Sequence, residues 1–219
     1  MNFLTFVIVL VGWIFSLCLH EFAHAFVAYQ GGDYTVREKG YLTFNPLKYT
    51  HPVYSLLLPL LFLLMGGIGL PGGAVYIERW RLRGPRWESA VSLAGPMANA
   101  LLALILGLAL HFAPVTNSGI WPGLAFLGLL QVSAVVLNLI PVPPFDGYGI
   151  IEPYLPMNWR IQIANTSGMI LMVVFLVLWF VPFVNSVFWG LVYLLAELLG
   201  IPLSLASLGL NQFMFLFRR

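Results

Sequence analysis

Two histidines and a glutamate stand close together at the end of the first apolar segment. His20 and His24 are four residues apart, so in a helix they share one face and can direct ring nitrogens at one ion. Glu21 lies beside the pair, within reach of a metal-bound water. This H-E-x-x-H spacing is typical of two zinc ligands and a general base. A polar helix end that faces lipid headgroups is the alternative explanation.

A catalytic zinc commonly takes three protein ligands, so one more is needed. Among the eight acidic residues Asp146 is the best candidate, because it closely follows an apolar segment. Prolines at 141, 143 and 144 block a continuous helix there and favour extended backbone. Gly147 permits a sharp turn after the acid. For this stretch alone, an ordinary proline-rich helix exit with an exposed aspartate is the alternative.

A third motif, Gly95-Pro96-Met97-Ala98-Asn99, lies near the start of the predicted helix 89–112. Proline is tolerated in a first helical turn, and small residues allow helices to pack closely. Asn99 places an amide inside an apolar bundle. It can serve either as an interhelical hydrogen-bonding group or as a catalytic one.

The composition excludes most classes of soluble protein. Of 219 residues, 60% are hydrophobic and only 8% are charged, against roughly 25% in globular proteins. So few charges cannot cover a soluble core. A soluble enzyme, a disordered chain and a nucleic-acid binder are therefore excluded, and the one cysteine, Cys18, forbids an intramolecular disulfide. We predict an all-α polytopic membrane protein.

Five segments are apolar and long enough to be membrane helices, at 3–28, 89–112, 121–140, 166–181 and 184–200. The last two are short and are separated by Pro182, so we expect a C-terminal hairpin over about 166–200. We expect five or six transmembrane helices in one membrane-embedded domain over 1–219, with the core over about 3–155.

Segment 52–77 is apolar but lies between two basic loops. A single crossing would separate these loops, against the positive-inside rule. We therefore predict a re-entrant segment, with a helix over 53–66 and a glycine-rich return as extended chain. All ten basic residues and the C-terminus then lie inside, and the N-terminus lies outside. Six plain crossings are the alternative.

The three motifs together resemble the site-2 protease family of intramembrane zinc metalloproteases. They occur in the family's order as His20-Glu21-x-x-His24, Gly95-Pro96-x-x-Asn99 and Asn138-x-x-Pro141-x-Pro143-Pro144-x-Asp146-Gly147. The stretches 42–46 and 71–73 are similar to the compact branch of the family, which lacks PDZ and CBS domains. The resemblance covers roughly residues 10 to 155.

This resemblance implies a fold, a cofactor and a set of site residues. His20, His24 and Asp146 would hold one Zn²⁺ per chain, and Glu21 would be the general base. Asn138 and Asn99 would contact the substrate backbone or an oxyanion. The return over 68–77 is similar to the family's re-entrant β-loop, which would present an edge to an unwinding substrate helix.

The expected activity is hydrolysis of peptide bonds within or near transmembrane segments. The partners would be a transmembrane protein substrate and the lipid bilayer, with either a regulatory membrane protein or a second copy of the chain as a further partner. We expect a bacterial or archaeal cell membrane, with the active site toward the cytoplasm. Three alternatives are a zinc-binding or transport protein without protease activity, a membrane protease of another clan and a non-catalytic scaffold.

Overall fold

The computed structural model describes residues 2–49, 75–112 and 116–214, and these residues form helices and loops without a strand. Four of the described helices are long and apolar enough to cross a membrane, or five if one bent pair is a single span. The prediction of an all-α polytopic membrane protein is confirmed. The predicted re-entrant segment at 52–77 lies almost entirely outside the described residues.

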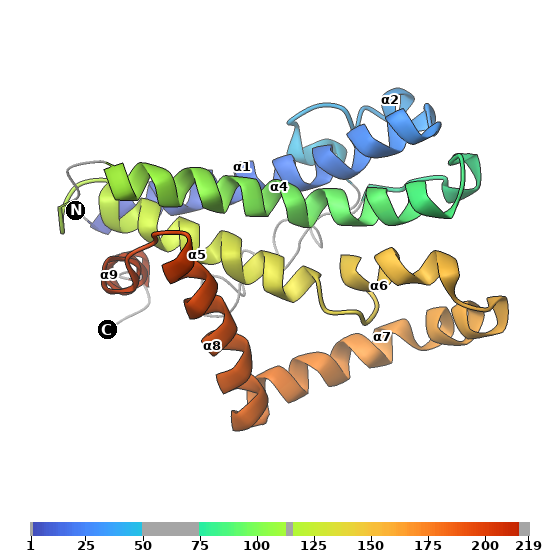
Figure 1. Cartoon of the computed structure of the whole chain (residues 1–219). Helices are drawn as coiled ribbons and strands as arrows, with labels where there is room; N and C mark the ends of the chain where they lie inside the picture. The colour runs from blue at the N-terminus through green and yellow to red at the C-terminus, as the bar shows by residue number, and fades with distance from the viewer. Residues whose placement is uncertain (1, 50–74, 113–115, 215–219) are drawn as a thin grey trace.

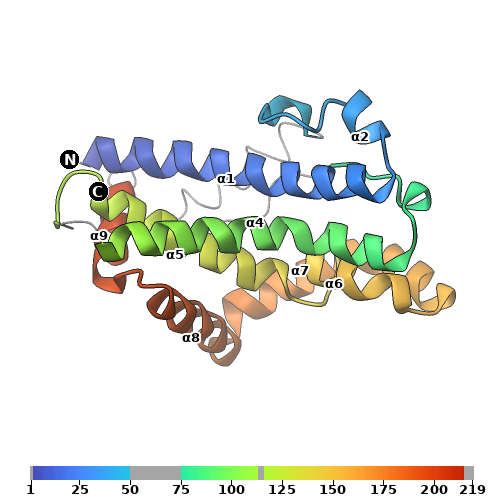
Figure 2. The ribbon, with the colours of Figure 1, turned by 45° about the horizontal axis from the view of Figure 1, so that its top comes forward.

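Three long helices form the central bundle, and they lie side by side in Figures 1 and 2. They are α1 (Asn2–Gly31), α4 (Pro85–Phe112) and α5 (Trp121–Asn138). Buried apolar side chains such as Trp13, Leu106 and Leu130 join them. α5 is the most enclosed, with 67% of its apolar window buried, because its neighbours cover it on several sides.

The C-terminal third contains α7 (Met157–Phe180), α8 (Pro182–Leu198) and α9 (Leu203–Phe213). α7 and α8 meet at Val181 and spread apart in Figure 1. α8 and α9 are bent by 116°. α9 lies across the end of the bundle where α1 begins, and there Thr5 Oγ1 donates to Gln212 Oε1 at 2.6 Å.

The position of α9 corrects the expected topology. The sequence predicted the N-terminus and the C-terminus on opposite faces, yet the Phe6 and Phe213 rings stack with centroids 5.3 Å apart. The end of α9 therefore lies beside the start of α1. The reason is the bend after α8, which turns the chain across the bundle instead of returning it to the other end.

Two helix starts also differ from the predicted ones, and one helix was not predicted. α7 begins at Met157 and not at 166, because its first turns carry polar residues that a hydropathy window scores as loop. α4 begins at Pro85, so Pro96 lies inside the helix and not in its first turn. α9 was not predicted at all.

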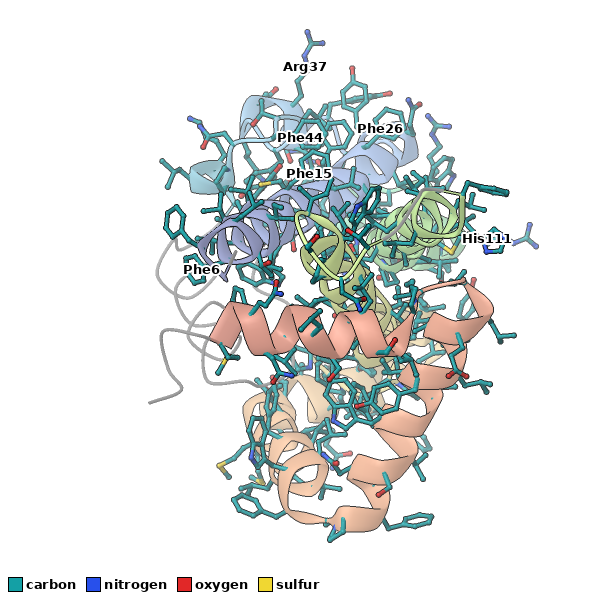
Figure 3. The ribbon with its side chains drawn as sticks, turned by 90° about the vertical axis from the view of Figure 1, so that its left-hand side faces the viewer. Phe6, Phe15, Phe26, Arg37, Phe44 and His111 are labelled. Carbon is teal, nitrogen blue, oxygen red and sulfur yellow. The ribbon has the colours of Figure 1, made fainter. Side chains whose placement is uncertain are left out.

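The stretch that follows α1 folds back along that helix. It contains the short helices α2 (Thr35–Glu38) and η1 (Pro46–Lys48). Phe44 stacks on Phe22 and Phe15, with ring centroids 4.9 and 5.9 Å apart, and Figure 3 shows Phe15, Phe26 and Phe44 on this face. Tyr49 is buried beneath them. These rings hold the loop against the outer side of α1.

Basic residues gather at one end of the molecule. The backbone N–H of Arg83 donates to the Gly31 carbonyl at the end of α1 at 3.0 Å. Lys39 pairs with Glu78, and Arg160 approaches Glu88 at 3.8 Å. Eight of the ten basic residues belong to the loops and helix starts at this end: Arg37, Lys39, Lys48, Arg79, Arg81, Arg83, Arg86 and Arg160. The last two, Arg218 and Arg219, lie outside the described residues.

Candidate metal centre

Three side chains converge at a buried point between α1, α4 and α6 (Asp146–Ile151). The Nε2 atoms of His20 and His24 are 3.0 Å apart. Asp146 Oδ2 lies 3.2 Å from His20 Nε2, and Asp146 Oδ1 lies 3.4 Å from His24 Nε2. Across the described part of the chain, this is the one group of three such side chains with metal-site spacing.

The arrangement fits zinc. Two imidazole nitrogens and one carboxylate oxygen are a common donor set for catalytic zinc. Donor atoms of a tetrahedral site with bonds of ~2.0–2.1 Å lie about 3.3 Å apart. The two Nε2 atoms are 3.0 Å apart, and each lies 3.2 or 3.4 Å from a different Asp146 oxygen, so the pairwise separations are of this size. The three residues therefore have the chemistry and the geometry to hold one ion.

α4 positions the two imidazoles. His24 Nδ1 lies 2.7 Å from the Val91 carbonyl oxygen, so His24 can donate there and leave Nε2 free for a metal. One turn further along α4, Gly95 lies directly against both rings. A Cβ at Gly95 would overlap the Nε2 atoms of His20 and His24. The glycine of the Gly-Pro-x-x-Asn motif thus makes room for the histidine pair.

The turn after α5 positions Asp146. α5 ends at Asn138, two residues before the predicted end at 140, and Phe145 is extended and buried before α6 begins at Asp146. Gly147 has a different function from the predicted one, because its φ is not positive. A Cβ there would overlap the Leu139 carbonyl, so Gly147 allows the start of α6 to pack against the end of α5.

Glu21 shares a cavity with the metal-binding residues. The cavity has a volume of about 370 Å³, and Glu21, His24 and Asp146 contribute to its wall. Glu21 is 3% exposed, and its Oε2 accepts the backbone N–H of Val75 at 3.1 Å. A carboxylate therefore stands beside the ligand cluster and faces a space large enough for water and a peptide segment.

The two predicted asparagines are buried but do not line this cavity. Asn99 lies one helical turn after Gly95, and its Oδ1 has no hydrogen-bond partner among the described residues. Asn138 is the last residue of α5. The structure thus places Glu21 in the same cavity as the ligands, whereas Asn99 and Asn138 are not among the residues that line it.

Ser92 and Arg79 also belong to the cavity wall, and neither was predicted from the sequence. Ser92 lies three residues before Gly95, on the same face of α4, so helical spacing from the motif could have found it. Arg79 follows the undescribed segment 50–74 and has no motif around it. Tyr76 is also in the wall, and it belongs to the return over 68–77 for which the motif resemblance implied a place beside the substrate. Arg79 also pairs with Glu152, so its guanidinium is anchored at the rim.

Comparison with known proteins is consistent with this geometry. The chain is 49% identical over 208 residues to "Putative zinc metalloprotease Rip2" of Mycolicibacterium smegmatis, covering 93% of this chain and 78% of the relative. It is 34% identical over 190 residues to "Putative zinc metalloprotease YwhC" of Bacillus subtilis, covering 80% and 81%.

A more distant relative is archaeal. "Putative zinc metalloprotease MJ0611" of Methanocaldococcus jannaschii is 26% identical over 174 residues, covering 80% of this chain and 84% of the relative. No family model and no solved structure matches the chain significantly. Apolar helices, the ligand cluster on α1 and α6, and these relatives agree with the motif resemblance. The chain belongs to the site-2 protease family of zinc metalloproteases.

Proposed function

We propose that the protein is an intramembrane protease that holds one zinc ion per chain and cleaves transmembrane protein substrates. The observation that supports this most directly is the convergence of His20, His24 and Asp146 beside Glu21. Two histidines and a carboxylate leave one position of a tetrahedral site for a water molecule.

In this proposal each residue has one task. Bound zinc would polarise the scissile carbonyl and lower the pKa of a water molecule. Glu21 takes the proton of the attacking water and gives it to the leaving amine, since its carboxylate faces the same cavity as His24 and Asp146. Val91 keeps the His24 ring oriented through its carbonyl. Asn99 and Asn138 would contact the substrate backbone or an oxyanion, although neither lines the cavity.

The position of the ligands along α1 supports cleavage within or near a transmembrane segment. At 1.5 Å per residue, His20 and His24 lie about 10–16 Å from the C-terminal end of α1. That helix is apolar enough to span the bilayer, and at about 45 Å it is longer than the hydrocarbon core of ~30 Å. We therefore propose that the ligands lie near the inner boundary of the core, where an unwound substrate helix needs new hydrogen-bond partners.

The basic end of the molecule supports an orientation. Basic residues favour the cytoplasmic face, and the ligands on α1 lie nearer to that end than to the helix start. We therefore place the active site toward the cytoplasm of a bacterial or archaeal cell. The bilayer and a transmembrane substrate are the expected partners. We also propose a further partner, either a regulatory membrane protein or a second copy of the chain, which would help to select the substrate.

Comparative proteomics of membrane fragments tests the proposed function. Cells with the wild-type protein should accumulate fragments cut within transmembrane segments, and cells with the Glu21→Gln variant should lack them. The variant should keep its zinc, because the three ligands are intact. Identical fragment patterns, together with zinc uptake that depends on His24, would instead support a transport protein without protease activity.

A further inference from the structure

A short irregular segment over 75–78 contributes one wall of the cavity. Val75, Tyr76 and Ile77 all contribute to that wall. The Val75 N–H donates to Glu21 Oε2 at 3.1 Å, so this segment touches the proposed general base directly. Its position therefore affects both the shape of the cavity and the orientation of Glu21.

The other end of the segment is attached to a buried aspartate. Asp33 follows α1 and is fully buried. Its Oδ1 accepts the backbone N–H of Thr35 at 3.1 Å and the Thr35 hydroxyl at 2.6 Å. Its Oδ2 accepts the backbone N–H of Glu78 at 2.7 Å. One carboxylate thus joins the turn after α1 to the end of the 75–78 segment.

Lys39, the residue after α2, adds a second attachment. Its Nζ donates to Glu78 Oε1 at 2.9 Å and to the Tyr76 carbonyl at 3.3 Å. Nζ also lies 4.8 Å from the centre of the Tyr76 ring. Hydrogen bonds from Arg81 and Lys39 lower the pKa of Glu78 to about 2, so its carboxylate is ionised at neutral pH.

None of these contacts belongs to the metal-binding motifs. Asp33 and Lys39 touch no ligand, and they act only on the segment between the cavity and the loop after α1. A buried carboxylate needs its hydrogen bonds, because an unpaired charge in a low dielectric is costly. Asp33 satisfies this need with three donors, two of them from Thr35 and one from the backbone of the cavity wall.

We propose that Asp33 is a positioning residue, which fixes the 75–78 segment so that Val75 holds Glu21 and the wall can receive an extended substrate. This inference rests on the proposed protease function. Lys39 assists, because its ammonium group binds the Tyr76 carbonyl and the Glu78 carboxylate. The proposal predicts that Asp33 affects turnover without affecting metal binding.

The Asp33→Asn variant tests this selectively. Asparagine keeps one oxygen acceptor for Thr35 but replaces the second oxygen with an NH₂ group, which cannot accept from Glu78. We expect backbone hydrogen exchange over 75–78 to rise while zinc content stays equal to wild type. Turnover of a quenched-fluorescence peptide containing one transmembrane helix should fall about tenfold to a hundredfold, because the base is misplaced.

Two further variants complete the design. Glu38→Gln makes a similar change of charge on an exposed residue of α2 and should behave as wild type. Lys39→Met should raise exchange over 75–78 and lower turnover in the same direction as Asp33→Asn. This second variant keeps the test decisive if Asp33→Asn fails to fold.

The outcomes separate the two proposals. Unchanged exchange over 75–78 in both Asp33→Asn and Lys39→Met would refute the attachment. Raised exchange with wild-type turnover would refute the positioning function and leave the protease proposal intact. A wild-type protein that cleaves nothing would contradict the protease function, and the exchange data, which need no substrate, would still decide whether Asp33 holds the segment.

Discussion

Gly95 leaves no space for a side chain beside His24, because a Cβ on its backbone would overlap the His24 Nε2 atom. The same Cβ would also overlap Nε2 of His20. These are the atoms that face Asp146. The close approach of α4 to α1 therefore has a direct consequence for metal binding.

Replacing Gly95 with alanine should weaken zinc binding. The added methyl group pushes the imidazoles apart, and we expect zinc affinity to fall about tenfold to a hundredfold, as for other changes around metal ligands. Competition with a chromogenic chelator measures the affinity. Gly168→Ala is the matched control, because a Cβ there meets nothing within 4 Å. Equal affinity in both variants would contradict this account.

Removal of a ligand and removal of the base should have different effects. His24→Ala and Asp146→Ala each delete one donor of the cluster, so zinc content and cleavage should both fall. Glu21→Gln should retain about one zinc per chain and lose cleavage by a factor of 10²–10⁴, because only general-base catalysis is lost. Atomic absorption on purified protein measures the zinc. If all three variants lost equal amounts of zinc, Glu21 would contribute to metal binding, and its assignment as the general base would be wrong.

Cysteine labelling can test the orientation of the chain. In a Cys18→Ser background, single cysteines at the exposed positions Lys48 and Arg83 should react with an impermeant reagent only from the cytoplasmic face. A cysteine at the exposed Asn117 should react from the opposite face, because α4 crosses between the two positions. Reaction of position 83 from the outer face would mean that segment 52–77 crosses the bilayer once.

The buried hydrogen bond between Thr5 and Gln212 should stabilise the attachment of α9. Gln212→Leu leaves the Thr5 hydroxyl without its partner, and we expect a loss of about 1 kcal/mol in the free energy of unfolding. A double-mutant cycle with Thr5→Val isolates the pair. Gln162→Leu, on the exposed side of α7, is the control. A coupling energy near zero would show that packing alone holds α9.

The grouping of His20, His24 and Asp146 could be predicted from the sequence because the motifs are local, while their role as zinc ligands stays a prediction. His20, Glu21 and His24 have their relative placement fixed by one helical turn, and Asp146 was found through the prolines before it. The hydrogen bonds that hold the 75–78 segment in the cavity wall could not be predicted in this way. Asp33 and Val75 meet the site region through backbone hydrogen bonds to residues far away in the chain, and such contacts leave no periodic pattern.

For the helices, too, local sequence patterns predicted some features, while others depend on contacts between distant segments. Hydropathy located the cores of α1, α4, α5, α7 and α8, because each is a long apolar run. Hydropathy did not identify α9, and it did not show that α9 lies at the end of the bundle where α1 begins. The bend before α9 includes Gly200 with a φ of 79° and Pro202, while its final position depends on contacts such as Gly209 against the Pro122 carbonyl. Only the folded bundle determines those contacts.

The exposure of α7 has a consequence for how the sequence can change over time. Only 6% of its apolar window is buried, against 67% for α5. Most of its side chains would therefore contact lipid acyl chains. There, the exchange of one apolar residue for another changes the free energy of folding only slightly. We expect deep mutational scanning to find α7 permissive to almost any apolar exchange. α5 should reject most changes of volume, since its neighbours are fixed. Two helices of similar hydropathy would then drift at very different rates among descendants of this gene.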